Sequence, residues 1–339
     1  MVVLLALTAC SWSAGRQTVA APSGPVTTVT TSAPAAPPPT AAPTTAATEP
    51  PTTAAPAATT APEAAPAAGS LPAAITTKDG VTLPVVDRQV DAYTVALPCG
   101  GTALAHGAPT PPITVVLDPG HGGRESGAVA SSGLAEKTVN LAVALQAQKA
   151  LQQAGISTVL THVGDYGMTL DARSQLAMAL KPKVFVSIHH NAEPDGPWPK
   201  PGSETYYQIA YPDSKRLAGL LYEEIVTALS QYNISWVADT DAGAKYRTGS
   251  TGNDYYAVLR QTHGVIAALA ELAFVSNPPE ADLVAQPQVQ QVEGQAVAKA
   301  IIRYLTTKDP GSGFTIPYPR ATPAGGGGGP SGCFNPPIS

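Results

Sequence analysis

Between residues 113 and 305, the spacing of apolar residues switches repeatedly between two periods. Short apolar or β-branched runs, typical of strands, alternate with longer runs whose apolar residues recur at helical spacing. This alternation predicts an α/β fold, with a mostly parallel, twisted sheet and helices on both faces, in a single domain. The predicted strands are 113–117, 156–162, 183–192, 203–210 and 264–277, and the predicted helices are 137–155, 168–181, 213–232 and 286–305.

The sequence on either side of this region has a different composition. Residues 11–74 are mostly Ala, Pro and Thr with three charged residues, so we expect a disordered tether. Residues 75–109 hold β-rich runs around an Asp-Gly turn and predict a small β appendage. Residues 309–339 form a Gly- and Pro-rich tail, which leaves 110–308 as the segment able to build a sizeable core.

Charge and the N-terminus bear on partners and location. The net charge is −5 without a basic block, so we expect no nucleic-acid partner. Residues 1–10, MVVLLALTAC, end in a sequence that resembles the lipobox of bacterial lipoproteins, in which the Cys is lipidated after cleavage. Cys10 is therefore a candidate lipid anchor, which would hold an exported, monomeric protein on the outer face of the cytoplasmic membrane. The alternative is an apolar N-terminus with a chance cysteine.

Two further cysteines, Cys99 and Cys333, flank the predicted core on either side. In an exported protein such a pair is a candidate disulfide, and it would tie the tail to the N-terminal flank. Two unpaired thiols are an equal alternative, because spacing alone does not fix connectivity.

Three polar residues stand where predicted strands end or a helix begins. His121 follows the first strand in LDPGHGG, Glu136 begins the first helix, and His189 ends a strand in VSIHHN. Two imidazoles and a carboxylate are a common ligand set for catalytic zinc, with a fourth position left for water. A loop histidine, a helix N-terminal acid and a buried structural histidine are the alternatives. Glu271 lies in an apolar run, where a carboxylate needs a charged or hydrogen-bonding partner, such as a buried arginine.

Six stretches together resemble the zinc-dependent N-acetylmuramoyl-L-alanine amidases of bacterial cell separation and spore-cortex hydrolysis. The resemblance covers about 113–306 and implies that His121, Glu136 and His189 bind Zn²⁺ and that Glu271 is the catalytic carboxylate. It also implies the reaction, which is hydrolysis of the amide bond between N-acetylmuramic acid and L-alanine in peptidoglycan. The stretches are VVLDPGHGG, EKTVNLAVAL, TLDARSQLA, FVSIHHNA, SETYY and LAELAFVSN.

Other residues near these motifs have expected supporting roles. Asp118 either bonds the free ring nitrogen of His121 or caps the turn. Arg173 is expected to brace the fold, and the alternative is a contact with substrate. His190 stands where the family has a small residue, and strand alternation predicts that it points away from the metal. His263 is expected at the surface.

The stretch 191–207 is short and Pro-rich, so it cannot hold the helix that blocks the zinc in some members of the family. We therefore expect an open site, with Trp198 either contacting substrate or packing over the loop. The alternatives to an amidase are a catalytically inactive cell-wall binding module and a zinc peptidase that acts on stem peptides.

Overall fold

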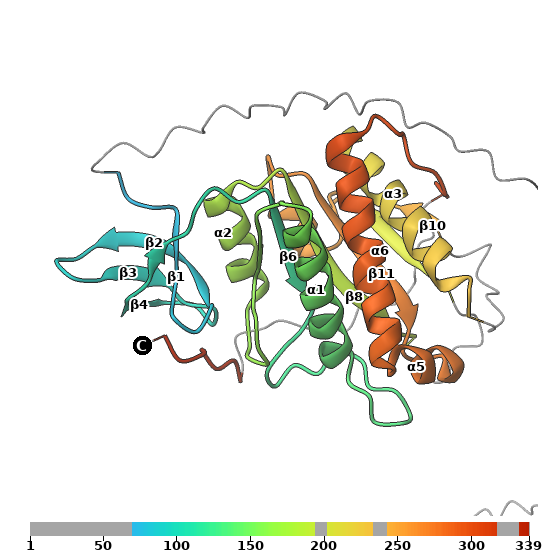
Figure 1. The fold of residues 1–339 in the computed structure, drawn as a ribbon, viewed down its shortest axis with the longest axis horizontal. Coiled ribbons are helices and arrows are strands. Elements are labelled where there is room, and N and C mark those ends of the chain that lie inside the picture. Colours follow the sequence, from blue (N-terminus) through green and yellow to red (C-terminus); the bar gives the residue numbers. More distant parts are fainter. Residues whose placement is uncertain (1–69, 194–201, 233–242, 317–331, 339) are drawn as a thin grey trace, which may run out of the picture. The chain divides into compact units, whose positions relative to one another are not determined.

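The computed structural model describes residues 70–193, 202–232, 243–316 and 332–338. The candidate anchor Cys10 and all of the predicted tether up to residue 69 lie outside the described residues, as does the part of the loop that carries Trp198. Figure 1 shows one sheet layered with long helices and a second, smaller sheet beside it.

The larger sheet has six strands, and they supply the carboxyl edge at which the candidate site lies. Four of its five neighbouring pairs are parallel, and the pair formed by β9 and β11 is antiparallel. The strands are β6 (Val115–Pro119), β7 (Thr158–Leu160), β8 (Val184–Asn191), β9 (Glu204–Tyr207), β10 (Gly243–Lys245) and β11 (Ala267–Phe274). Their order across the sheet is β10-β9-β11-β8-β6-β7.

Helices cover both faces of this sheet. The largest core cluster joins one face to α1, α3 and α6, and a second cluster joins the other face to α2 and α4. Among the described residues the helices are α1 (Glu136–Gln153), α2 (Leu170–Leu180), α3 (Pro212–Leu229), α4 (Ala257–Arg260), α5 (Pro278–Val284) and α6 (Pro287–Thr306). The prediction of a mixed α/β domain is confirmed. No helix within the described ranges is both long and apolar enough to cross a membrane.

The smaller sheet precedes the α/β core in the chain and is antiparallel throughout. It consists of β1 (Ala74–Thr76), β2 (Thr82–Arg88), β3 (Tyr93–Ala96), β4 (Thr102–Ala105) and β5 (Ala108–Pro109), in the order β4-β3-β2-β1-β5. The consecutive strands β1 to β4 are joined by connections of a few residues, which permit antiparallel pairing only, since a parallel pair needs a long crossover. Among the described residues, parallel pairs are therefore confined to the larger sheet, and the chain holds one mixed and one antiparallel sheet.

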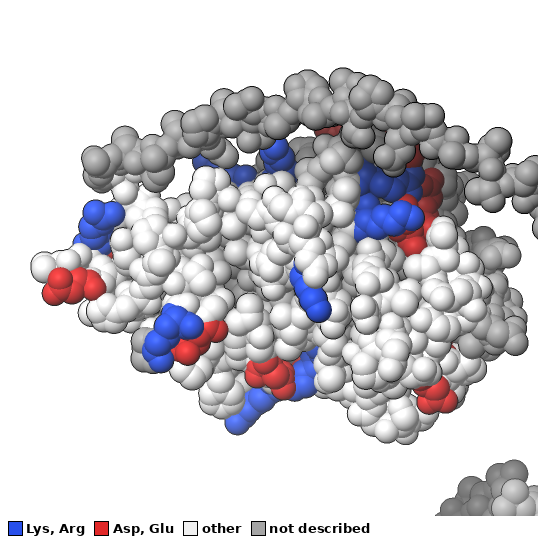
Figure 2. Space-filling view, viewed as in Figure 1, with Lys and Arg blue, Asp and Glu red and all other residues white. Residues whose placement is uncertain are grey.

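This appendage is packed against the α/β core and does not hang free. Ala74 of β1 is fully buried against Met168, Ala172 and Leu176 on and beside α2. On the face drawn in Figure 2, charged side chains form small groups of mixed sign on a largely uncharged surface.

Candidate metal centre

β6 carries His121 to the carboxyl edge of the sheet. The strand is buried along its whole length and ends at Pro119, two positions before the histidine. His121 has a φ of 65°, a left-handed backbone conformation that is uncommon outside glycine. Its carbonyl accepts a hydrogen bond of 2.6 Å from Arg173 Nη2. A strained backbone of this kind persists only where surrounding contacts hold it in place.

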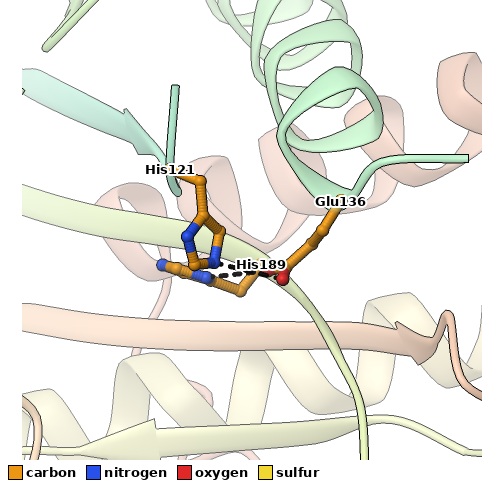
Figure 3. A group of neighbouring side chains, drawn as sticks. All are labelled: His121, Glu136 and His189. Carbon is orange, nitrogen blue, oxygen red and sulfur yellow. Dashed lines mark hydrogen bonds and ion pairs between the residues drawn. The ribbon is translucent and has the colours of Figure 1, made fainter. Parts of the chain in front are cut away.

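The carboxylate of Glu136 faces two neighbouring imidazoles that come from different elements (Figure 3). It is the first residue of α1, where the helix dipole favours a carboxylate. One of its oxygens is 3.1 Å from His121 Nε2 and accepts a hydrogen bond of 2.9 Å from the Ala128 amide. The other oxygen is 3.0 Å from Nδ1 of His189, which comes from the end of β8.

The geometry of these three residues fits a single metal ion. One ligand atom from each residue can be chosen so that all lie within 4.8 Å of one another. Gly120 leaves room for this arrangement, because a Cβ at that position would lie 2.2 Å from Cε1 of His189. Two imidazole nitrogens and one carboxylate form a donor set suited to zinc, with coordination left over for water or substrate. The structure therefore brings together the three residues that the sequence proposed as ligands.

In the metal-free cluster Glu136 is ionised and His121 is protonated, so a metal ion that binds here displaces the proton of His121. Burial would raise the pKa of Glu136, but His121 and His189 beside it hold that pKa well below its ordinary value, so the carboxylate is ionised. Burial lowers the pKa of His189, which favours the neutral imidazole that binds metals. Burial also acts to lower the pKa of His121, but Glu136 and Glu125 outweigh it and raise that pKa to about 10.

Glu125 is a functional candidate that the sequence reasoning missed. Its Oε1 lies 3.0 Å from Nδ1 of His121, on the opposite side of the ring from Glu136. Metal-binding histidines commonly donate their second ring nitrogen to a carboxylate, which fixes the ring orientation. The chain turns back between Gly122 and Glu125, whose backbone groups exchange two hydrogen bonds of 3.0 and 3.2 Å. The sequence signal that could have identified Glu125 is an acidic residue four positions after His121.

The structure corrects the expected role of Asp118. The residue is fully buried and accepts hydrogen bonds of 2.7 Å from Arg173, Thr161 and Ser187, so it neither bonds His121 nor caps an exposed turn. Burial raises the pKa of Asp118, but the charge of Arg173 and these hydrogen bonds outweigh it, and the net shift is downward. Arg173 links this carboxylate to the carbonyl of His121 and so supports the backbone of the loop that carries His121.

His190 points to the opposite face of β8 and connects to Glu136 through a buried chain of polar groups. Its Nδ1 lies 2.7 Å from Oδ1 of Asn140, whose amide donates to Glu136 Oε1 at 3.2 Å. The other ring nitrogen lies 3.4 Å from both carboxylate oxygens of Glu293 on α6. All three supporting residues are at most 1 % exposed. The alternation of the strand predicted the direction of His190 but not these partners.

Glu271 stands beside the cluster in the neighbouring strand. It is in register with His189 of β8 on one side and with Glu204 of β9 on the other, so the three side chains share one face of the sheet. The carboxylate of Glu204 is occupied by Lys245 at 2.8 Å and by Asn191 at 2.7 Å. Glu271 is the middle member of this row and is 9 % exposed.

Two other residues from the sequence analysis are described. The structure joins Cys99 and Cys333 in a disulfide across 234 positions of sequence. His263 is exposed, away from the cluster in the chain and outside its hydrogen bonds.

An α/β fold with a His-Glu-His cluster at the carboxyl edge of its sheet indicates a candidate metal-binding protein. Comparison with known proteins identifies its family. Residues 115–303, more than half of the chain, match the family model described as N-acetylmuramoyl-L-alanine amidase. The chain belongs to this family.

Individual proteins are similar to this chain over more than half of its length. YqiI, an uncharacterized protein of Bacillus subtilis (strain 168), is 34% identical over 193 residues, which are 56% of this chain and 84% of that protein. The germination-specific N-acetylmuramoyl-L-alanine amidase of the same organism is 30% identical over 208 residues, or 57% and 80% of the two chains. The crystal structure of an N-acetylmuramoyl-L-alanine amidase from Clostridium difficile 630 aligns with a TM-score of 0.50 and 30% identity, covering 59% of this chain and 100% of that one.

Proposed function

We propose that the protein is a zinc-dependent N-acetylmuramoyl-L-alanine amidase that hydrolyses the bond between N-acetylmuramic acid and L-alanine in peptidoglycan. The observation that carries this proposal is the convergence of His121, Glu136 and His189, with Glu271 in register beside His189. Membership of the amidase family supplies the bond and the substrate class.

The chain's own residues divide the work of the reaction. His121, Glu136 and His189 would hold Zn²⁺, which supplies Lewis acidity toward a water molecule and the scissile carbonyl. Glu271 takes a proton from the attacking water and later delivers it to the leaving amine of L-alanine, as a positioned general acid–base. Glu125 orients the ring of His121 through its second nitrogen.

The role of Glu271 is tested by replacing it with glutamine, which keeps the size of the side chain. The variant should retain zinc at one ion per chain, while turnover of purified peptidoglycan falls by roughly 10²- to 10⁴-fold. His189→Ala is the matched comparison and should lose zinc and activity together. Near-normal turnover by Glu271→Gln would show that another group moves the proton.

Mass spectrometry of the digestion products separates the proposal from the other functions. An amidase releases intact stem peptides that begin with L-alanine and leaves muramic acid without a peptide. A peptidase would shorten the stem, and a binding module would release neither product. Removal of zinc by a chelator should stop product formation, and restored zinc should recover it.

The proposed setting is the cell envelope, where the enzyme acts as a monomer. The relatives include proteins named as probable cell wall amidases, which agrees with a peptidoglycan substrate. A lipid on Cys10 would hold the catalytic domain at the outer face of the cytoplasmic membrane, with residues 11–74 as its tether. Labelling with a fatty-acid analogue should mark the wild type and not Cys10→Ala, and an unlabelled wild type would remove the anchor from the proposal.

A further inference from the structure

The loop that carries His121 needs support because its backbone is strained. Beyond the left-handed His121, its neighbours Gly122 and Gly123 also have positive φ values, of 134° and 63°. None of these three residues belongs to a helix or to a named strand of the sheet. The position of the His121 ring therefore depends on what packs against the loop from outside.

Residues 164–167 pack directly on this loop. A Cβ on Gly122 would lie 2.5 Å from the Tyr166 carbonyl oxygen, and one on Gly123 would lie 2.6 Å from the Gly167 nitrogen, so the two backbones are in contact. The Gly123 amide also donates a hydrogen bond of 2.7 Å to Asp165 Oδ1. The loop and residues 164–167 are therefore in direct backbone contact.

The C-terminal segment 332–338 packs in turn against residues 164–167. The sulfur of Cys333 rests on Gly167, where a Cβ would approach it to 2.7 Å, and the sulfur of Cys99 lies 3.8 Å from the Gly167 carbonyl oxygen. The segment also reaches the His121 loop directly, because the guanidinium of Arg124 lies 4.3 Å from the centre of the Phe334 ring.

The same segment is fastened to the antiparallel appendage. Asn335 Oδ1 accepts a hydrogen bond of 2.8 Å from the Cys99 amide, and Ile338 packs against the appendage core. The Cys99–Cys333 disulfide makes this attachment covalent. The appendage, the tail and the 164–167 segment form a continuous stack that ends at a metal-ligand loop.

We propose that the C-terminal segment 332–338, fastened by the Cys99–Cys333 disulfide, is a brace that positions His121 for metal binding. The inference rests on the proposed metal centre and adds a role for the appendage and tail, which lie outside the residues that match the family. Without the disulfide, contact between the segment and Gly167 depends on weak surface packing, since Phe334 is 57% exposed. The His121 loop then samples more conformations, and the affinity for metal falls.

The experiment compares the full-length wild type with the double variant Cys99→Ser/Cys333→Ser, which has no unpaired thiol at this site. Zinc affinity of the metal-free proteins is measured by competition with a chromophoric chelator, and amide hydrogen exchange is measured on the same metal-free samples. We expect zinc affinity to fall about tenfold or more, as for other residues that orient metal ligands. Exchange should become faster in peptides that cover 120–127 and 163–168.

Leu221→Ala on α3 is the matched control, because it opens the buried core in a helix that makes none of the contacts described above for segment 332–338. It should lower the melting temperature without changing exchange at 120–127 or zinc affinity. If the double variant does not refold, the folded wild type is reduced under native conditions and its exchange is followed instead.

The proposal would be overturned if protein shown by mass to lack the disulfide had unchanged hydrogen exchange and unchanged zinc affinity. It would also be overturned if hydrogen exchange became faster to the same extent in α3 and in the His121 loop. A wild type that binds no zinc would defeat the metal centre, while the exchange measurement would still decide whether the brace exists.

Discussion

Replacing Asp118 with asparagine should lower the free energy of unfolding by about 3–5 kcal/mol, because it leaves a buried guanidinium without its countercharge. Asp118 and Arg173 are 0% and 2% exposed, and their side chains are 2.7 Å apart. Arg173 keeps backbone acceptors at Pro119 and His121, both at 2.6 Å, so we expect the lower end of the range. Asparagine keeps the shape of the side chain, so little of the loss comes from a cavity.

The effect should depend on pH in a defined direction. The pKa of Asp118 is lower in the folded protein than its unfolded value of about 3.9. The contribution of the carboxylate is therefore complete above about pH 4 and is lost as the pH falls through the lower, folded pKa. The difference between wild type and Asp118→Asn should shrink as the solution becomes more acidic than this.

Urea unfolding followed by circular dichroism, at pH 7 and at several values below 4, measures both quantities. Asp79→Asn serves as the control, because Asp79 forms an exposed pair with Lys78 at 3.6 Å and should change stability little. A loss below 1 kcal/mol for Asp118→Asn at pH 7, or a difference that grows as the pH falls, would refute the reasoning about the buried pair.

Three further changes test the surroundings of the metal centre, all by zinc competition on purified protein. Gly120→Ala places a methyl group 2.2 Å from the ring of His189 and should abolish tight zinc binding, and normal binding would mean that the ring has room to move. Glu125→Gln should weaken zinc binding roughly 10-fold through loss of the charged partner of the His121 ring, with unchanged affinity counting against that role. His190→Ala should weaken zinc binding by about 10- to 100-fold. The control Thr205→Val loses one buried hydrogen bond of 2.9 Å elsewhere in the sheet and should leave zinc binding unchanged. Equal effects of the two changes would mean that His190 contributes only to general stability.

The sequence predicted most elements of the larger sheet because their periodicity is strong. The helix expected at 137–155 is α1 at Glu136–Gln153, and the strand expected at 183–192 is β8 at Val184–Asn191. The direction of the strands was harder to predict from the sequence. Periodicity gives the faces of a strand but not its orientation, so the antiparallel placement of β9 did not follow from the pattern. The smaller sheet was easier to predict, because its β-rich runs flank an Asp-Gly turn.

The candidate site was predictable where residues follow a strand end or begin a helix, as His121, Glu136 and His189 do. It was not predictable where contacts join distant parts of the chain through side chains alone. Glu293 lies 103 positions from His190, and nothing in the helical pattern of α6 indicates that its carboxylate faces inward. Asp118 was misassigned because its partners Arg173 and Ser187 come from other elements.

The alignment of β11 with its neighbours limits how an inactive form of this protein can be made. All eight residues of AALAELAF are buried, so alternation between an inner and an outer side cannot tell the strand which alignment to adopt. Glu271 is the one charged member, and a slip by a single position would turn its carboxylate toward the core beneath α1, α3 and α6. A leucine at position 271 would remove the one charged residue of β11, which distinguishes the native register from a register shifted by one residue. Glutamine keeps a polar side chain at this position. A loss of activity in Glu271→Gln can therefore be attributed to the missing carboxylate and not to a shifted strand register.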